Sequence, residues 1–147
     1  MPPSDPYDLE RFVTAQHAGG TYDRAASELR AGRKTSHWMW FIFPQIAGIG
    51  YSAMTRRYAI VSLDEARAYL CHPVLGQRLI ECARILAESK APSADHILGE
   101  TDALKLRSSM TLFLHAAPDE PAFKQVLARF FSGVPDEFTE QRLQLQD

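Results

Sequence analysis

The sequence predicts an all-α fold, a compact single-domain bundle of about seven helices with an irregular middle segment, spanning residues 1–147. Three observations favour this class. Apolar residues recur at helical spacing along most of the chain. Capping patterns open these segments, and glycine or proline closes them. No Asn-Gly or Asp-Gly pair joins two alternating segments, so no β-hairpin is indicated.

The first third of the chain predicts two helices and one ambiguous segment. The first helix should begin with Asp5 as its N-cap and Pro6 at its first helical position, and it should end at Gly19-Gly20. A second helix covers 22–31 and stops at Gly32. The apolar run 38–43 is the one strand candidate, because periodicity cannot assign so short a segment.

The middle of the chain predicts two consecutive helices. Ser62-Leu63-Asp64-Glu65 matches a capping box, in which Ser62 and Glu65 would bond each other's backbone N–H groups. This helix should halt at His72-Pro73. The next one carries a regular apolar stripe of Leu75, Leu79, Cys82 and Leu86, which is typical of an amphipathic helix.

The last third predicts a short turn and three helices. The turn spans 94–98 and ends at Gly99. Thr101 or Asp102 is expected to cap a helix that runs to about His115. Pro118 and Pro121 bracket a turn. The apolar stripe that follows it predicts a helix ended by Gly133-Val134-Pro135, and its members are Phe123, Val126, Leu127, Phe130 and Phe131. Asp136 caps a weaker last helix.

Composition limits the classes of function. The chain has 147 residues, 46% of them hydrophobic, which is enough for one core. The 16 basic and 18 acidic residues give a net charge of −2, so we expect no nucleic-acid partner. The start lacks the pattern of a secretion signal, and the longest apolar run is far shorter than the roughly 18 residues of a membrane span. With only two cysteines, we expect a reduced, cytoplasmic protein that does not bind membranes.

Four stretches carry a resemblance to a known family. They are DPYDLERFVTAQ, GRKTSHWMWFIFPQ, SLDEARAYLCHPVLGQRLIEC and DALKLRSSMTLF. Together they cover nearly the whole chain, which resembles the bacterial family called domain of unknown function 1810, sometimes labelled calpastatin-like. The resemblance implies an all-α single domain and no established activity. The composition is that of a self-burying globule, whereas a calpastatin is an extended inhibitor that orders on its protease.

The stretch GRKTSHWMW has a structural and a functional interpretation. Burial of the apolar run explains the two tryptophans, whose indole N–H groups must then find acceptors. Burial does not explain the basic residues that directly precede the apolar run. In the functional interpretation, Arg33, Lys34, Ser36 and His37 line the rim of a pocket for an anion, and a tryptophan stacks on the ligand.

The stretch KLRSSMT lies on a helix that is apolar on most sides and should therefore be largely buried. Lys105, Ser108 and Ser109 would then lie inside the fold or line a cleft. The serines have an alternative role in bonds to the preceding helical turn, and Lys105 has an alternative partner in Asp102 or Glu100. Glu28, Glu81 and Asp102 are conceivable general bases, although lone acids in helices are usually solvated.

Two hypotheses follow. The first is a cleft for a small phosphate- or nucleotide-type anion, with His37 as acid/base if the protein is an enzyme, which the sequence leaves open. Its ligand-binding residues would be Arg33, Lys34, Ser36, His37, Trp38, Trp40, Lys105, Ser108 and Ser109. The second is a non-catalytic protein-interaction or regulatory module that docks partners through aromatic edges such as Tyr51, Phe130 and Phe131. Both hypotheses are compatible with a monomer or a homodimer.

No cofactor and no metal are expected, because the five histidines lack metal-ligand spacing. Gly48-Ile49-Gly50 fits the glycine pattern of dinucleotide sites, but no βαβ unit surrounds it. Two interpretations of this loop remain. One is a flexible turn with two exposed arginines, which we prefer. The other is a loop whose N–H groups face an anion near Arg56-Arg57.

Overall fold

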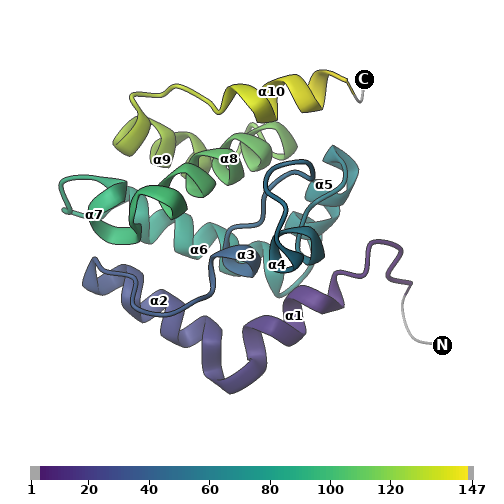
Figure 1. The fold of residues 1–147 in the computed structure, drawn as a ribbon, viewed down its shortest axis with the longest axis horizontal. Coiled ribbons are helices and arrows are strands. Elements are labelled where there is room, and N and C mark those ends of the chain that lie inside the picture. Colours follow the sequence, from purple (N-terminus) through teal and green to yellow (C-terminus); the bar gives the residue numbers. More distant parts are fainter. Residues whose placement is uncertain (1–3, 146–147) are drawn as a thin grey trace.

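The computed structural model describes residues 4–145, and these form ten α-helical segments and the 3-10 turn η1 (Ala18–Gly20) (Figure 1). Seven helices have eight or more residues: α1 (Glu10–His17), α2 (Thr21–Ala31), α5 (Leu63–Cys71), α6 (Leu75–Ala87), α8 (Glu100–Ala116), α9 (Pro121–Phe131) and α10 (Glu137–Gln144). The others are α3 (Met39–Ile42), α4 (Ala53–Arg57) and α7 (Ala94–Leu98). The all-α class is confirmed. The expected number of about seven is too low, because three helices have only four or five residues.

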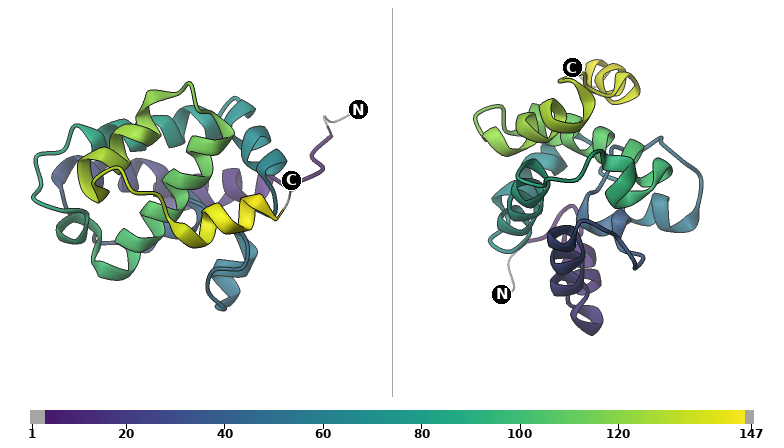
Figure 2. Two further views of the ribbon diagram at one scale, coloured as in Figure 1. Left: turned by 90° about the horizontal axis from the view of Figure 1, so that it is seen from above. Right: turned by 90° about the vertical axis from the view of Figure 1, so that its left-hand side faces the viewer.

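The long helix α8 organises the packing. It contacts α5, α7, α9 and α10, while α6 contacts α2, α5 and α9. Figures 1 and 2 show α9 and α10 at one end of the molecule and α1 and α2 at the other. Buried residues of α8 include Leu106, Met110 and Phe113, each with no exposed surface. Burial on several sides is what the sequence predicts for this helix.

The ambiguous apolar run folds as a helix. Met39–Ile42 forms the single turn α3, and Trp38 precedes it as a completely buried side chain. The extended pairing near it is a single bridge between Ile46 and Ile60, and the described residues contain no strand. That bridge holds the segment after α3 against the segment before α5, through the bonds Ile60 N–H to Gln45 O and Ala47 N–H to Ile60 O.

Three expectations about helix starts need correction, two of them in the position of the start and one in a capping bond only. Asp5 does accept bonds from the N–H groups of Leu9 and Glu10, but α1 begins four residues later than Pro6 because Asp8 has a positive φ of 52°. Ser62 accepts from Glu65 N–H as expected, whereas the Glu65 carboxylate bonds Val61 N–H and Arg11.

The start of α8 is the third case. Gly99 precedes this helix, and neither Thr101 nor Asp102 caps it, because both already lie within the first turn. The carboxylate of Asp102 is therefore free to pair with side chains from outside the turn.

The two cysteines should differ sharply in reactivity. Cys71 is exposed, whereas Cys82 is buried on the α6 stripe, and this burial raises the pKa of the Cys82 thiol to about 12. Because the thiolate is the nucleophile, we expect one thiol per chain to react with Ellman's reagent in the native protein and two in urea. The Cys71→Ser variant should show almost no reaction before unfolding. Rapid native reaction of this variant would contradict the buried placement of Cys82.

Candidate functional site

Glu28 of α2 fixes the loop that carries the first predicted site residues. Its Oε1 accepts bonds from Thr35 N–H (2.7 Å), Ser36 N–H (3.0 Å) and the Trp38 indole N–H (3.0 Å), and its Oε2 accepts from the Ser36 hydroxyl (2.6 Å). The indole thus has the acceptor that its burial requires. Burial by itself would raise the pKa of Glu28, but the bonds from Ser36, Thr35 and Trp38 outweigh it and lower the pKa to about 2.

This arrangement assigns Glu28 a structural role. A carboxylate with four donors and a depressed pKa is a poor proton acceptor near neutral pH, so Glu28 is not suited to the general-base role that the sequence left open. It is also not solvated, since only 9% of the residue is exposed. Its effect is to hold Thr35, Ser36 and Trp38 in one conformation.

The two predicted stretches meet at Asp102. Lys34 Nζ lies 3.0 Å from Asp102 Oδ2, and Lys105 Nζ lies 3.5 Å from Asp102 Oδ1. Lys34 Nζ is also 5.2 Å from the ring centre of Trp38, and Lys105 Nζ is 5.6 Å from that of Trp40. Lys34 N–H donates to Ile97 O, which ties the loop to α7. Two ammonium groups therefore share one carboxylate, which leaves a local charge of about +1.

The other predicted residues lie in different surroundings. Arg33 and His37 are exposed, and neither side chain has a hydrogen bond or ion pair to another residue within 4–145. The Ser36 hydroxyl donates to Glu28, and Trp38 has no exposed surface, so both side chains are already occupied within the fold. Ser109 Oγ is buried and has no partner within the described part of the chain. A catalytic role for His37 stays a prediction.

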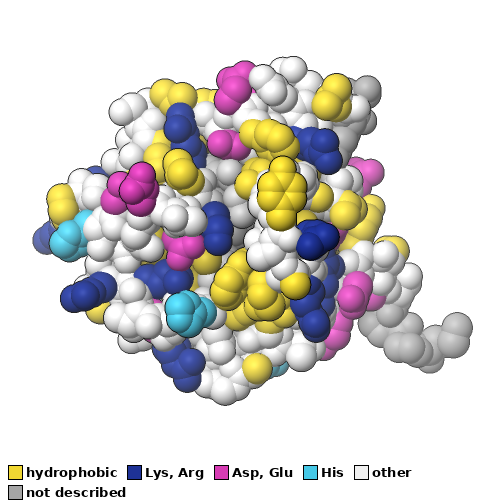
Figure 3. All heavy atoms as spheres, in the orientation of Figure 1, with side chains coloured by type: hydrophobic (Ala, Val, Ile, Leu, Met, Phe, Trp, Pro, Cys, Tyr) yellow, Lys and Arg dark blue, Asp and Glu magenta, His cyan; other side chains and the backbone are white. Residues whose placement is uncertain are grey.

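A cavity of about 490 Å³ adjoins Lys105. It lies between the segment 45–50, one side of α8 and the start of α10, and Figure 3 shows basic, acidic and hydrophobic side chains meeting on this face of the molecule. Its lining residues are Gln45, Gly48, Ile49, Gly50, Thr101, Leu104, Lys105, Ser108, Asp136 and Phe138. The sequence predicted Lys105 and Ser108 as ligand-binding residues. It did not predict that the segment 45–50 and the start of α10 would line the same site. Arg56 and Arg57 line a separate depression with Arg11.

The walls of this cavity are held by α10. Arg142 Nε donates to Ala47 O at 3.2 Å, and its guanidinium lies only 3.1 Å from the position that a Cβ on Gly48 would take. With a φ of +103°, Gly48 also has a backbone conformation that other residues rarely adopt. Asp136 caps α10 by accepting from Thr139 N–H and the Thr139 hydroxyl, both through Oδ2.

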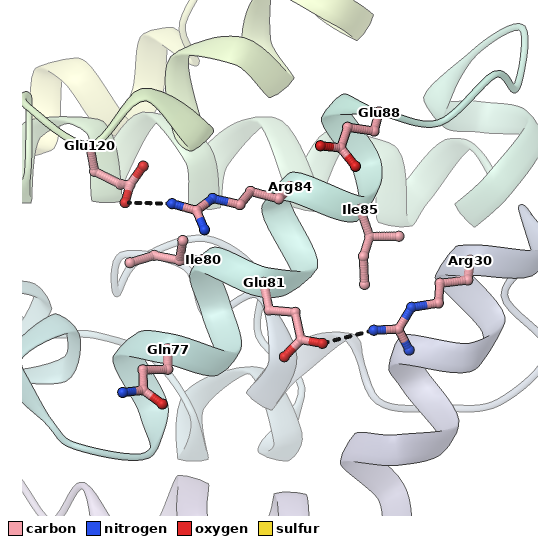
Figure 4. A pocket seen from close by; sticks show the side chains of 8 residues that line it. All are labelled: Arg30, Gln77, Ile80, Glu81, Arg84, Ile85, Glu88 and Glu120. Atoms are coloured by element: carbon pink, nitrogen blue, oxygen red, sulfur yellow. Dashed lines mark hydrogen bonds and ion pairs between the residues drawn. The ribbon is translucent and has the colours of Figure 1, made fainter.

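A second, open groove runs along α6 (Figure 4). Four of its five charged side chains form ion pairs, Arg30 with Glu81 at 2.8 Å and Arg84 with Glu120 at 3.7 Å. The fifth, Glu88, forms no ion pair with another described residue. Because these pairs neutralise most of its charge, the groove offers a ligand fewer free groups than the cavity at Lys105 does.

The three aromatic residues of the interaction hypothesis differ in exposure. Tyr51 is 88% exposed, but Phe130 and Phe131 are half-buried, with the guanidinium groups of Arg129 and Arg107 over their rings. Both phenylalanines are therefore less exposed than Tyr51, and their role in docking stays a prediction. Within residues 4–145 there is no group of three or more metal-ligating side chains, and no helix there combines the length and apolarity needed to cross a bilayer.

Comparisons with known proteins agree with this fold. The crystal structure of the conserved hypothetical protein Rv1873 from Mycobacterium tuberculosis is similar, with a TM-score of 0.92 and 47% identity over 95% of this chain and 99% of that chain. No curated protein matches the chain. Residues 6–143 match the model of a family described as a protein of unknown function, DUF1810. The chain therefore belongs to the DUF1810 family.

Proposed function

We propose that this protein binds a small organic anion in the cavity between the segment 45–50 and α8. The observation that carries the proposal is the incomplete pairing of Lys105 at the cavity wall. Its ammonium lies 3.5 Å from a carboxylate that already pairs at 3.0 Å with Lys34. The Lys34 side chain is 10% exposed, and that of Lys105 is 23% exposed. Lys105 is thus the cation that a ligand can reach.

Charge balance supports an anionic group at this point. Two partly buried ammonium groups repel each other, and one shared carboxylate compensates only half of their charge. A carboxylate or phosphate placed on Lys105 would supply the missing charge and a charge-assisted hydrogen bond. The Ser108 hydroxyl, which bonds no other described residue, lines the same cavity and adds a neutral donor.

The remaining walls support an apolar body for the ligand. Ile49, Leu104 and Phe138 line the cavity, and 60% of Leu104 and 42% of Phe138 are exposed. Large exposed apolar side chains beside a few polar groups are typical of small-molecule sites. A compact organic acid fits this combination better than inorganic phosphate, which would leave the apolar walls in water.

Calorimetric titration with 3-phenylpropanoate and 4-methylpentanoate tests the proposal. We expect saturable binding of both acids and at least a tenfold loss of affinity in Lys105→Met, which keeps the stem but removes the charge. Lys90→Met is the matched control, because Lys90 is exposed and outside the cavity. Absence of binding to either acid, or equal affinities in the two variants, would refute the proposal.

A further inference from the structure

We infer that the ligand of this cavity is a zwitterion, a small amino acid with an apolar side chain, whose carboxylate meets Lys105 and whose ammonium meets Asp136. The inference rests on the proposed function and adds the second charged group and the class of molecule. The cavity wall contains one cation and one anion, Lys105 and Asp136. Lys105 Nζ lies 3.5 Å from Asp102 Oδ1, and the bonds that Asp136 accepts from described residues use only Oδ2.

Asp136 offers a free oxygen. Both bonds that cap α10 go to Oδ2, from Thr139 N–H at 3.0 Å and from the Thr139 hydroxyl at 2.7 Å. Oδ1 accepts no hydrogen bond from the residues that the structure describes, and it is not sealed from solvent. Asp136 N–H donates to the Thr111 hydroxyl of α8, which fixes the residue at this position. The capping bonds and this contact hold the carboxylate rigid before any ligand arrives.

A simple anion would leave this carboxylate uncompensated. Binding excludes water from the cavity, so a buried Asp136 oxygen without a donor would cost free energy. An ammonium group on the ligand would supply that donor and would be attracted by the charge. Asp136 also repels ligands that carry several negative charges, so the cavity disfavours polyanions. The pair of opposite charges therefore selects a molecule that also carries both.

The apolar walls select the rest of the molecule. Ile49, Leu104 and Phe138 contact whatever occupies the space beside the two charged groups. An aliphatic or aromatic side chain would bury apolar surface against them, which favours binding. The cavity volume of about 490 Å³ is within the range of small-molecule sites. Apolar amino acids combine all three features in one compact molecule.

The test uses two pairs of probes that differ only in the ammonium group: phenylalanine with 3-phenylpropanoate, and leucine with 4-methylpentanoate. By calorimetry, we expect each amino acid to bind the wild-type protein about tenfold more tightly than its des-amino partner. In Asp136→Asn this preference should vanish, while affinity for the two acids stays the same or rises. Asparagine caps helices as well as aspartate does, so this variant removes the charge and keeps the start of α10.

The outcomes separate the two proposals. If the acids bind as tightly as the amino acids, the zwitterion inference is wrong and the organic-anion function stands. If no probe binds, or if phenethylamine binds as tightly as phenylalanine, the organic-anion function fails and the inference fails with it. Asp119→Asn is the control for the loss of one acidic charge, because Asp119 is exposed and outside the cavity. A preference that survives in Asp136→Asn also overturns the inference.

Discussion

Glu28→Gln is expected to lower the free energy of unfolding by about 3 kcal/mol at pH 7. The carboxylate of Glu28 accepts four hydrogen bonds from Thr35, Ser36 and Trp38. The glutamine amide has one oxygen and one NH₂ group, and that NH₂ group would face donors instead of acceptors. Urea denaturation followed by tryptophan fluorescence measures this loss, and Trp38 itself reports on the disrupted contact.

The effect should depend on pH in one direction. The pKa of Glu28 falls from its ordinary value of 4.5 to about 2 on folding, so ionised Glu28 stabilises the native state fully above about pH 4.5. That stabilisation, roughly 3 kcal/mol from the two pKa values, is lost as the pH falls toward 2. The difference between wild type and Glu28→Gln should therefore shrink steadily between pH 5 and pH 2.

Glu81→Gln is the control for this experiment, since Glu81 is an acid whose side chain is 48% exposed and whose ion pair lies at the surface. We expect it to cost less than about 1 kcal/mol. A Glu28→Gln variant as stable as Glu81→Gln, or a difference from wild type that grows in acid, would show that Glu28 does not anchor the loop.

Gly76→Ala is expected to destabilise the protein by about 3 kcal/mol, although alanine is the better helix former by about 1 kcal/mol. Gly76 lies in the first turn of α6, where a Cβ would come within 2.0 Å of the Leu70 carbonyl oxygen at the end of α5. That oxygen belongs to the backbone, so it can move away only if α5 and α6 separate. Thermal unfolding followed by circular dichroism measures the change.

Gln77→Ala is the matched control, because it places alanine on the exposed side of the same helical turn. This control should be neutral or slightly stabilising. Equal melting temperatures for Gly76→Ala and Gln77→Ala would contradict the close approach of the two helices.

Much of the fold was predictable because it follows from local chemistry. The stripe of Leu75, Leu79, Cys82 and Leu86 predicted α6, and all four side chains are buried. Errors arose where local signals are ambiguous. Asp5 does bond the N–H groups at the start of α1, but it is not the N-cap, which is Leu9. The positive φ of Asp8, which delays the helix, leaves no pattern in the sequence.

The candidate site was predictable only in part. Asp102 pairs with both Lys34 and Lys105, and for Lys105 this is the structural alternative that the sequence left open. Lys105 lines the cavity, whereas Lys34 does not. The role of Glu28 was missed, because the need of Trp38 for an acceptor does not reveal which acid supplies it. Asp136 was missed as a wall residue, because its position against α8 depends on contacts between distant segments. On the cavity wall opposite Lys105, the glycine pattern Gly48-Ile49-Gly50 was the one feature that the sequence indicated.

The most direct test of ligand binding at Lys105 is an NMR titration of the ¹⁵N-labelled protein with 3-phenylpropanoate. We expect saturable shifts of the amide signals of 48–50 and 104–108, with little change in α6 around Glu81 and Arg84. Shifts centred on the α6 groove, or no saturable shifts at all, would contradict the assignment of the cavity as the binding site.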